Sequence, residues 1–197
     1  MNKLQFCLVL LAALFLFPQC EEPLEYKYKE RPLNISCASV DNDLLREALY
    51  SFQDDMAKKY NDPDIILGTK SSYIHSYRQY IYRGMNGQAP YKEMASPYTL
   101  EILEKLKNVE GLWDMEREGS HLDYTGEFMS CIFENIKDEE LRTRINSLVE
   151  VNYLTPKNVA EIMRQNVNKA FNDEYLAIYI ALDGYYQYLL DIPTENE

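Results

Sequence analysis

Apolar side chains recur at helical spacing through most of the chain from position 41 onward. Leu45, Leu49, Phe52 and Met56 follow one another at intervals of three or four residues, directly after Asp41. This spacing places the four side chains on one face of a helix. An aspartate just before such a run can accept a hydrogen bond from the first backbone N–H groups. The pattern therefore predicts a first helix that begins near position 41.

Further helix starts follow from the same reasoning. Capping residues, three of them followed by proline, precede later apolar runs at Asp62 with Pro63, Ser96 with Pro97, Asp138, and Thr155 with Pro156. The second helix is expected to run to Gly84, and the third is expected to end before Gly111. Another helix is expected to carry Phe128 and Ile132. Since no strand pattern or internal repeat of 20–50 residues is apparent, we expect an all-α bundle of about six or seven helices over residues 40–192, with 193–197 as a tail.

The last predicted helix differs from the others in its polarity. Residues 175–190 are apolar around most of the helical circumference, which predicts a central, buried helix. Asp183, Gln187 and Asp191 stand four residues apart and so form one narrow polar stripe. We expect this stripe to be a solvent-facing edge of the helix, because an isolated buried carboxylate is costly. The alternative is that Asp183 is a buried catalytic acid.

Residues 113–126 are the least regular part of the predicted domain and are rich in charge, which indicates a long connection. His121, Asp123 and Glu127 bring imidazole and carboxylate groups together within seven positions. These are weak candidate ligands for a metal ion, because no H-E-x-x-H pair or second histidine cluster accompanies them. The alternative is a solvated loop histidine beside a charged helix start.

The chain contains 17 tyrosines, and three of them share a predicted helix face. Tyr73, Tyr77 and Tyr80 offer a large contact area with polar tips, as at many binding surfaces. A tyrosine stripe at helical spacing is also typical of core packing. The sequence leaves both interpretations open, with the core the more common.

The N-terminus has the pattern of an export signal. An unbroken apolar run over residues 6–17 follows Lys3 and is stopped by Pro18 and Gln19. Crossing a bilayer takes about 20 apolar residues, so this run is too short for a transmembrane helix. An A-x-A-like cleavage site is missing between the run and Cys20.

This segment resembles the precursors of bacterial lipoproteins, in which a cysteine follows the apolar run and receives lipid. Cys20 occupies that position, although Phe17, Pro18 and Gln19 depart from the usual aliphatic and small residues. The pair Glu21 and Glu22 is similar to the acidic tag of surface lipoproteins in Bacteroidota-type bacteria. The resemblance implies a signal peptide over 1–19, lipidation (palmitate) of Cys20, and an outer-membrane location. Residues 20–39 are then expected to form a flexible tether.

Two other cysteines remain after such processing, Cys37 and Cys131. Exported proteins fold where disulfides persist, so the two thiols can pair. The alternative is two buried free cysteines that pack as small hydrophobic residues.

The net charge and the motif content limit the classes of function that are expected for this chain. The formal net charge is −12, and loss of residues 1–19 removes Lys3 and no acid, which leaves −13. This charge disfavours binding to nucleic acid and to anionic membrane surfaces, and it favours a basic protein partner. The alternative is that the acidic charge only keeps a membrane-tethered domain from aggregating. Common catalytic and cofactor motifs are absent from the sequence. We therefore expect a non-enzymatic, protein-binding lipoprotein without a cofactor. The alternatives are an immunity protein that neutralises a basic toxin, and a carboxylate-dependent hydrolase at His121.

Overall fold

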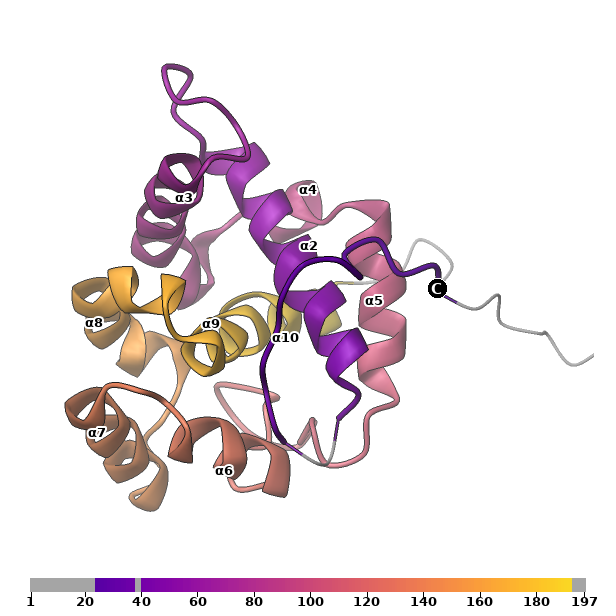
Figure 1. Ribbon diagram of the computed structural model, residues 1–197. Coiled ribbons are helices and arrows are strands. Elements are labelled where there is room, and N and C mark those ends of the chain that lie inside the picture. Colours follow the sequence, from indigo (N-terminus) through magenta and orange to yellow (C-terminus); the bar gives the residue numbers. More distant parts are fainter. Residues whose placement is uncertain (1–23, 38–39, 193–197) are drawn as a thin grey trace, which may run out of the picture.

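The computed structural model describes residues 24–37 and 40–192 and is all-α, as the sequence predicts (Figure 1). The α-helices are α2 (Asn42–Tyr60), α3 (Lys70–Arg83), α4 (Tyr91–Met94), α5 (Pro97–Lys107), α6 (Glu127–Glu134), α7 (Glu139–Glu150), α8 (Pro156–Asn166), α9 (Glu174–Ala181) and α10 (Gln187–Leu190). They are extended or joined by a kinked turn, η1 (Gly84–Gln88), by a π-helical turn, η3 (Leu182–Tyr186), and by a 3-10 turn, η2 (Val167–Phe171). In η1 the backbone angles of Asn86 and Gly87 are not helical.

Four of the predicted helix starts are confirmed by side-chain caps. Asp41, Ser96, Asp138 and Thr155 each accept a hydrogen bond from a backbone N–H in the first turn of α2, α5, α7 and α8. Each cap satisfies an N–H group that has no partner within its helix. The local sequence is therefore sufficient to place these four ends.

The start of the second helix was predicted wrongly. Helix α3 begins at Lys70 and is capped by Thr69, seven positions after Asp62. Asp62 instead closes a turn by accepting from the N–H of Asp64 at 2.9 Å. Gly68 has φ +82°, a left-handed conformation that cannot continue a right-handed helix. Helix α3 therefore does not extend back through residue 68.

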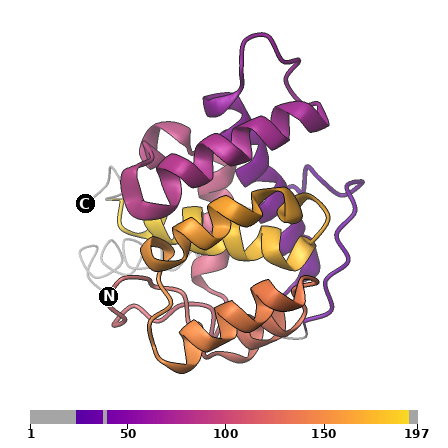
Figure 2. The same ribbon diagram turned by 90° about the vertical axis from the view of Figure 1, so that its left-hand side faces the viewer.

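Helices α9 and α10 are joined through η3 into one rod at the centre of the molecule, which confirms the predicted central helix (Figures 1 and 2). Every residue from 176 to 187 is buried. The rod packs against α2 on one side and α6 on another. Helix α2 also contacts α3 and α5, so that the core lies between α2 and the rod.

The turns η1 and η3 place two backbone carbonyls where tyrosine hydroxyls can reach them. Tyr80 donates to the carbonyl of Gly184 in η3, and Tyr91 donates to the carbonyl of Gly84 in η1. A Cβ atom added at Gly84 would lie 2.7 Å from the Tyr80 ring. The close approach of that ring requires glycine at position 84.

Residues 24–37 do not form the tether that was predicted over 20–39. They run along α2 and end in a disulfide between Cys37 and Cys131 of α6, with Cα atoms 5.9 Å apart. Ile35 is 2% exposed, so part of the segment belongs to the core. The pairing of these cysteines, which the sequence left open, is thus present. The predicted signal peptide and Cys20 lie outside the described residues.

Candidate functional site

The connection between α5 and α6 is irregular but firmly fixed. Trp113 and Leu122 form an isolated antiparallel bridge, and the N–H of Asp114 donates to the carbonyl of His121 at 2.7 Å. The indole of Trp113 donates to the carbonyl of Leu106 at the end of α5, also at 2.7 Å. Leu122 is completely buried. The connection therefore has a defined shape, although it contains no helix.

Asp183 lies beneath this connection, and the prediction of a solvent-facing stripe was wrong for two of its three residues. Asp183 is 0% exposed and Gln187 is 2% exposed, whereas Asp191 is exposed. The hydroxyls of Ser120 and Tyr124 donate to Asp183 Oδ1 at 2.9 and 2.5 Å. The connection thus covers Asp183 and Gln187 and supplies two hydrogen bonds to Oδ1 of the buried carboxyl group, whereas its Oδ2 is buried without a hydrogen-bond partner.

Burial has a clear effect on this carboxyl group. Desolvation raises the pKa of Asp183 to about 6, whereas the hydroxyls of Tyr124 and Ser120 act in the opposite direction. The guanidinium of Arg117, which lies 4.6 Å from the ring centroid of Tyr124, also lowers it. Asp183 therefore changes its charge within a mildly acidic pH range while it supports the connection from below.

The three candidate metal ligands make separate contacts. His121 Nε2 lies 2.9 Å from Asp191 Oδ1, and Asp123 Oδ1 accepts from the N–H of Gly126 at 3.0 Å. Glu127 stands exposed in the first turn of α6. Within residues 24–37 and 40–192, no group of three or more His, Cys, Asp or Glu side chains is arranged to hold a metal ion. The geometry assigns these residues to loop and helix-end contacts.

The three candidate tyrosines, Tyr73, Tyr77 and Tyr80, do not form a binding surface. Tyr77 is 1% exposed and Tyr80 is 0% exposed, and both pack edge-on against the ring of Phe52. Of these three, Tyr73 alone is partly accessible, and its hydroxyl donates to Asp54 Oδ1 at 2.7 Å. The core-packing interpretation is therefore correct for Tyr77 and Tyr80.

A different surface combines apolar and acidic side chains. Met115 on the α5–α6 connection is 58% exposed, and Val151 and Tyr153 in the turn after α7 are 70% and 60% exposed. Arg117 Nη2 donates to Asn152 Oδ1 at 2.8 Å and so joins the connection to the turn. We call residues 113–118 and 151–153 the loop platform.

The loop platform is acidic and hollowed. Its own acids and those beside it are Glu110, Asp114, Glu116, Glu118 and Glu150. A hollow of about 420 Å³ lies where the connection meets the turn, lined by Arg117, Glu118, Asn152, Leu154 and Thr155. Sequence reasoning placed the possible binding surface on Tyr73, Tyr77 and Tyr80 and missed Met115, Val151 and Tyr153. The available sequence signal was Asn152, because asparagine favours the turn that ends a helix and here has a large apolar residue on each side.

The buried carboxylates of the domain are engaged in holding the fold together. Asp55 accepts from the hydroxyls of Thr99 at 2.5 Å and Tyr185 at 3.0 Å, and Asp183 is bonded as described. Ser120 donates to Asp183 rather than to the imidazole of its neighbour His121. Among the residues that the structure describes, a nucleophile, a base and an orienting group are therefore not assembled around His121.

Comparisons with protein-family models, with curated proteins and with solved structures find no match for this chain. Among the described helices, none has the length and apolar character needed to cross a membrane.

Proposed function

We propose that this chain is a lipid-anchored envelope protein that binds a protein partner through the loop platform and performs no chemistry of its own. The observation that carries the proposal is the exposure of Met115, Val151 and Tyr153 on two segments that the hydrogen bond from Arg117 to Asn152 joins. Large exposed apolar side chains rimmed by polar residues are typical of interaction sites.

The composition of the loop platform suits a protein interface. Met and Tyr are enriched at such interfaces, and a fixed backbone lowers the entropy lost on binding. Asp183 and Trp113 provide that fixed backbone through their bonds to both ends of the connection. The surrounding carboxylates would steer a basic partner, as expected for a chain with a net charge of −12 before processing.

The anchor is part of the proposal and rests on the N-terminal sequence. The apolar run over residues 6–17, the missing A-x-A site and the acids after Cys20 support lipidation of Cys20 and an outer-membrane location. Metabolic fatty-acid labelling of the wild-type chain and of Cys20→Ser tests it. Label that persists unchanged in Cys20→Ser would contradict it.

The binding surface is tested with the full chain solubilised in detergent. A partner captured from envelope extract should be retained at low salt and released at high salt, because screening shortens the range of charge attraction. The double variant Met115→Ala, Tyr153→Ala should no longer capture this partner at low salt. Tyr82→Ala is the matched control, because Tyr82 is 69% exposed on α3, away from the loop platform. Equal capture by both variants would contradict the assignment.

The acidic rim also favours a second candidate, an immunity protein that neutralises a basic toxin. The purified partner distinguishes the two functions. Stoichiometric addition of the chain abolishes the partner's activity if the chain is an inhibitor and leaves it intact if the chain is an accessory module. A hydrolase at His121 is the weaker alternative, because Ser120 and Asp183 are bonded to each other.

A further inference from the structure

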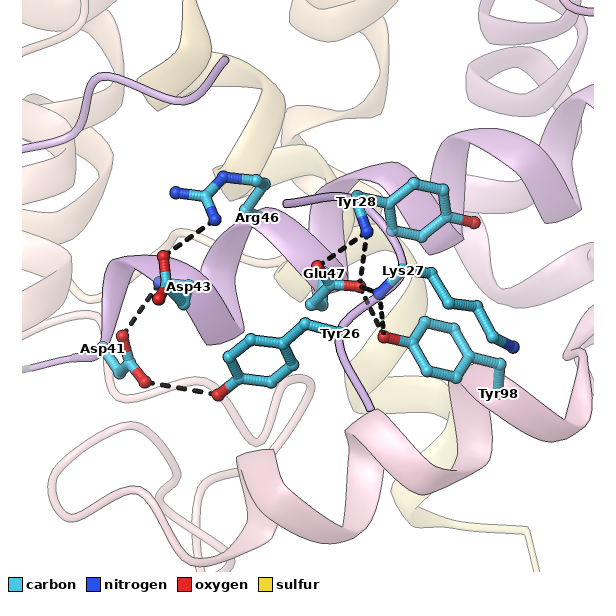
Figure 3. Close-up of polar contacts among 8 residues, drawn as sticks. All are labelled: Tyr26, Lys27, Tyr28, Asp41, Asp43, Arg46, Glu47 and Tyr98. Atoms are coloured by element: carbon cyan, nitrogen blue, oxygen red, sulfur yellow. Dashed lines mark hydrogen bonds and ion pairs between the residues drawn. The ribbon is translucent and has the colours of Figure 1, made fainter. Parts of the chain in front are cut away.

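A buried glutamate holds the start of the described chain. Glu47 in α2 is 0% exposed and accepts from the backbone N–H groups of Lys27 at 2.8 Å and Tyr28 at 2.9 Å (Figure 3). The hydroxyl of Tyr98 at the start of α5 donates to the same carboxylate. Hydrogen bonds to an ionised carboxylate are stronger than neutral ones, so this contact fixes the backbone of residues 27 and 28.

The rest of the segment is fixed along its length. Tyr50 donates to the carbonyl of Pro32 at 2.6 Å, and the N–H of Asn34 donates to Glu174 at 2.8 Å. The disulfide of Cys37 closes the far end. We call residues 24–37 the strap, since Glu47 binds it near one end and a covalent bond holds the other.

The strap leaves little chain between the domain and the proposed anchor. From Cys20 to Leu24 the chain spans at most about 14 Å when fully extended, whereas a free segment from 20 to 39 would reach about 60 Å. We propose that the strap holds the domain directly on the phospholipid headgroups, with the start of α5 towards the membrane. This inference rests on the lipidation of Cys20, which belongs to the proposed function.

The position of the strap decides which side of the domain faces the lipid. The first described residues lie beside α5, where Lys27 Nζ lies 3.6 Å from the ring centroid of Tyr98 (Figures 1 and 3). Lys27 and Lys29 are exposed between Glu25 and Glu30, which are exposed as well, and the two ammonium groups can pair with phosphate headgroups. Helix α8 lies on the opposite side of the molecule from α5 in Figure 1. The orientation therefore keeps α8 away from the membrane.

Energy transfer from the domain to the lipid surface tests this orientation. A donor fluorophore is attached to the full lipidated chain through Glu101→Cys on α5 or Lys157→Cys on α8, both exposed positions. The vesicles contain phosphatidylethanolamine and phosphatidylglycerol with an acceptor on the headgroups. The native chain should show markedly higher transfer from position 101 than from position 157.

A control variant lengthens the chain and leaves the strap intact. A Gly/Ser insert of about 20 residues after Pro23 has a root-mean-square span of about 25 Å and should remove the difference between the two labels. Equal transfer from both labels in the native chain, while it still floats with vesicles, would overturn the orientation and leave the anchor standing. Failure to float would overturn the anchor and the orientation together.

Discussion

The hydroxyl of Ser120 donates to Oδ1 of Asp183 at 2.9 Å, across 63 positions of the chain. This bond joins the α5–α6 connection to the central rod and fixes the base of the loop platform. An unpaired buried carboxyl group costs several kcal/mol, so the hydroxyls of Ser120 and Tyr124 offset part of that cost. Asp183 thus supports the shape of the loop platform from beneath, although this buried side chain would not contact a bound partner.

The ionisation of Asp183 should make stability depend on pH. Its pKa rises from 3.8 in the unfolded chain to about 6 in the fold, so its contribution is fully present below pH 4 and is lost as the pH rises through 6. A shift of this size corresponds to about 3 kcal/mol. Asp183→Asn keeps an acceptor for Ser120 and cannot ionise. The unfolding free energy of Asp183→Asn minus that of wild type should therefore increase by about 3 kcal/mol as the pH rises from 4 to 7.

Urea unfolding of both proteins at several pH values measures this difference. Subtracting the wild-type curve from that of Asp183→Asn removes the effect of other acids, such as Asp138, whose pKa is lowered by Lys169. Parallel curves across pH 4–7 would contradict the burial-driven shift.

Truncation of two tyrosines on the same helix should have very different effects. Tyr80 is completely buried among aromatic rings, so Tyr80→Ala should lower the unfolding free energy by about 3–5 kcal/mol. Tyr82 is 69% exposed, so Tyr82→Ala should stay within about 0.5 kcal/mol of wild type. Thermal or urea unfolding checks the pair, and equal losses would show that the tyrosine face of α3 is misplaced.

Loss of the disulfide should destabilise the domain and free one end of the strap. Cys37 and Cys131 are 94 positions apart, and closing a loop of that size contributes about 4–5 kcal/mol in the chain-entropy model. The double variant Cys37→Ser, Cys131→Ser should therefore unfold at a lower urea concentration than wild type. Alkylation of the unreduced wild-type protein followed by mass spectrometry should find both thiols protected, and two alkylated cysteines would contradict the bond.

Much of the helical architecture could be predicted because its signals are local. A cap such as Ser96 or Thr155 acts on N–H groups two or three residues away, and the apolar circumference of residues 175–190 requires burial wherever the helix packs. Gly68 was visible in the sequence, but its positive φ was not, and the start of α3 was therefore missed.

The proposed binding surface could not be predicted in the same way, because the contacts that shape it join residues that are distant in the sequence. Asp183 looked solvent-facing by spacing alone, and only the fold shows that Ser120 covers it. The strap looked like a linker because it has no helical period, yet Glu47 supplies the hydrogen bonds that its backbone lacks. Polar side chains that form hydrogen bonds with residues far away in the sequence leave no periodic pattern in the sequence.

Photo-crosslinking in living cells tests the central claim most directly. A photoreactive amino acid is placed at position 115 or 153 of the loop platform, with position 82 on α3 as the matched exposed control. We expect one discrete protein adduct from positions 115 and 153, weakened by Glu116→Lys with Glu118→Lys, and no such adduct from position 82. The absence of an adduct at 115 and 153, or an equal adduct at 82, would contradict the assignment of the loop platform as the partner-binding surface.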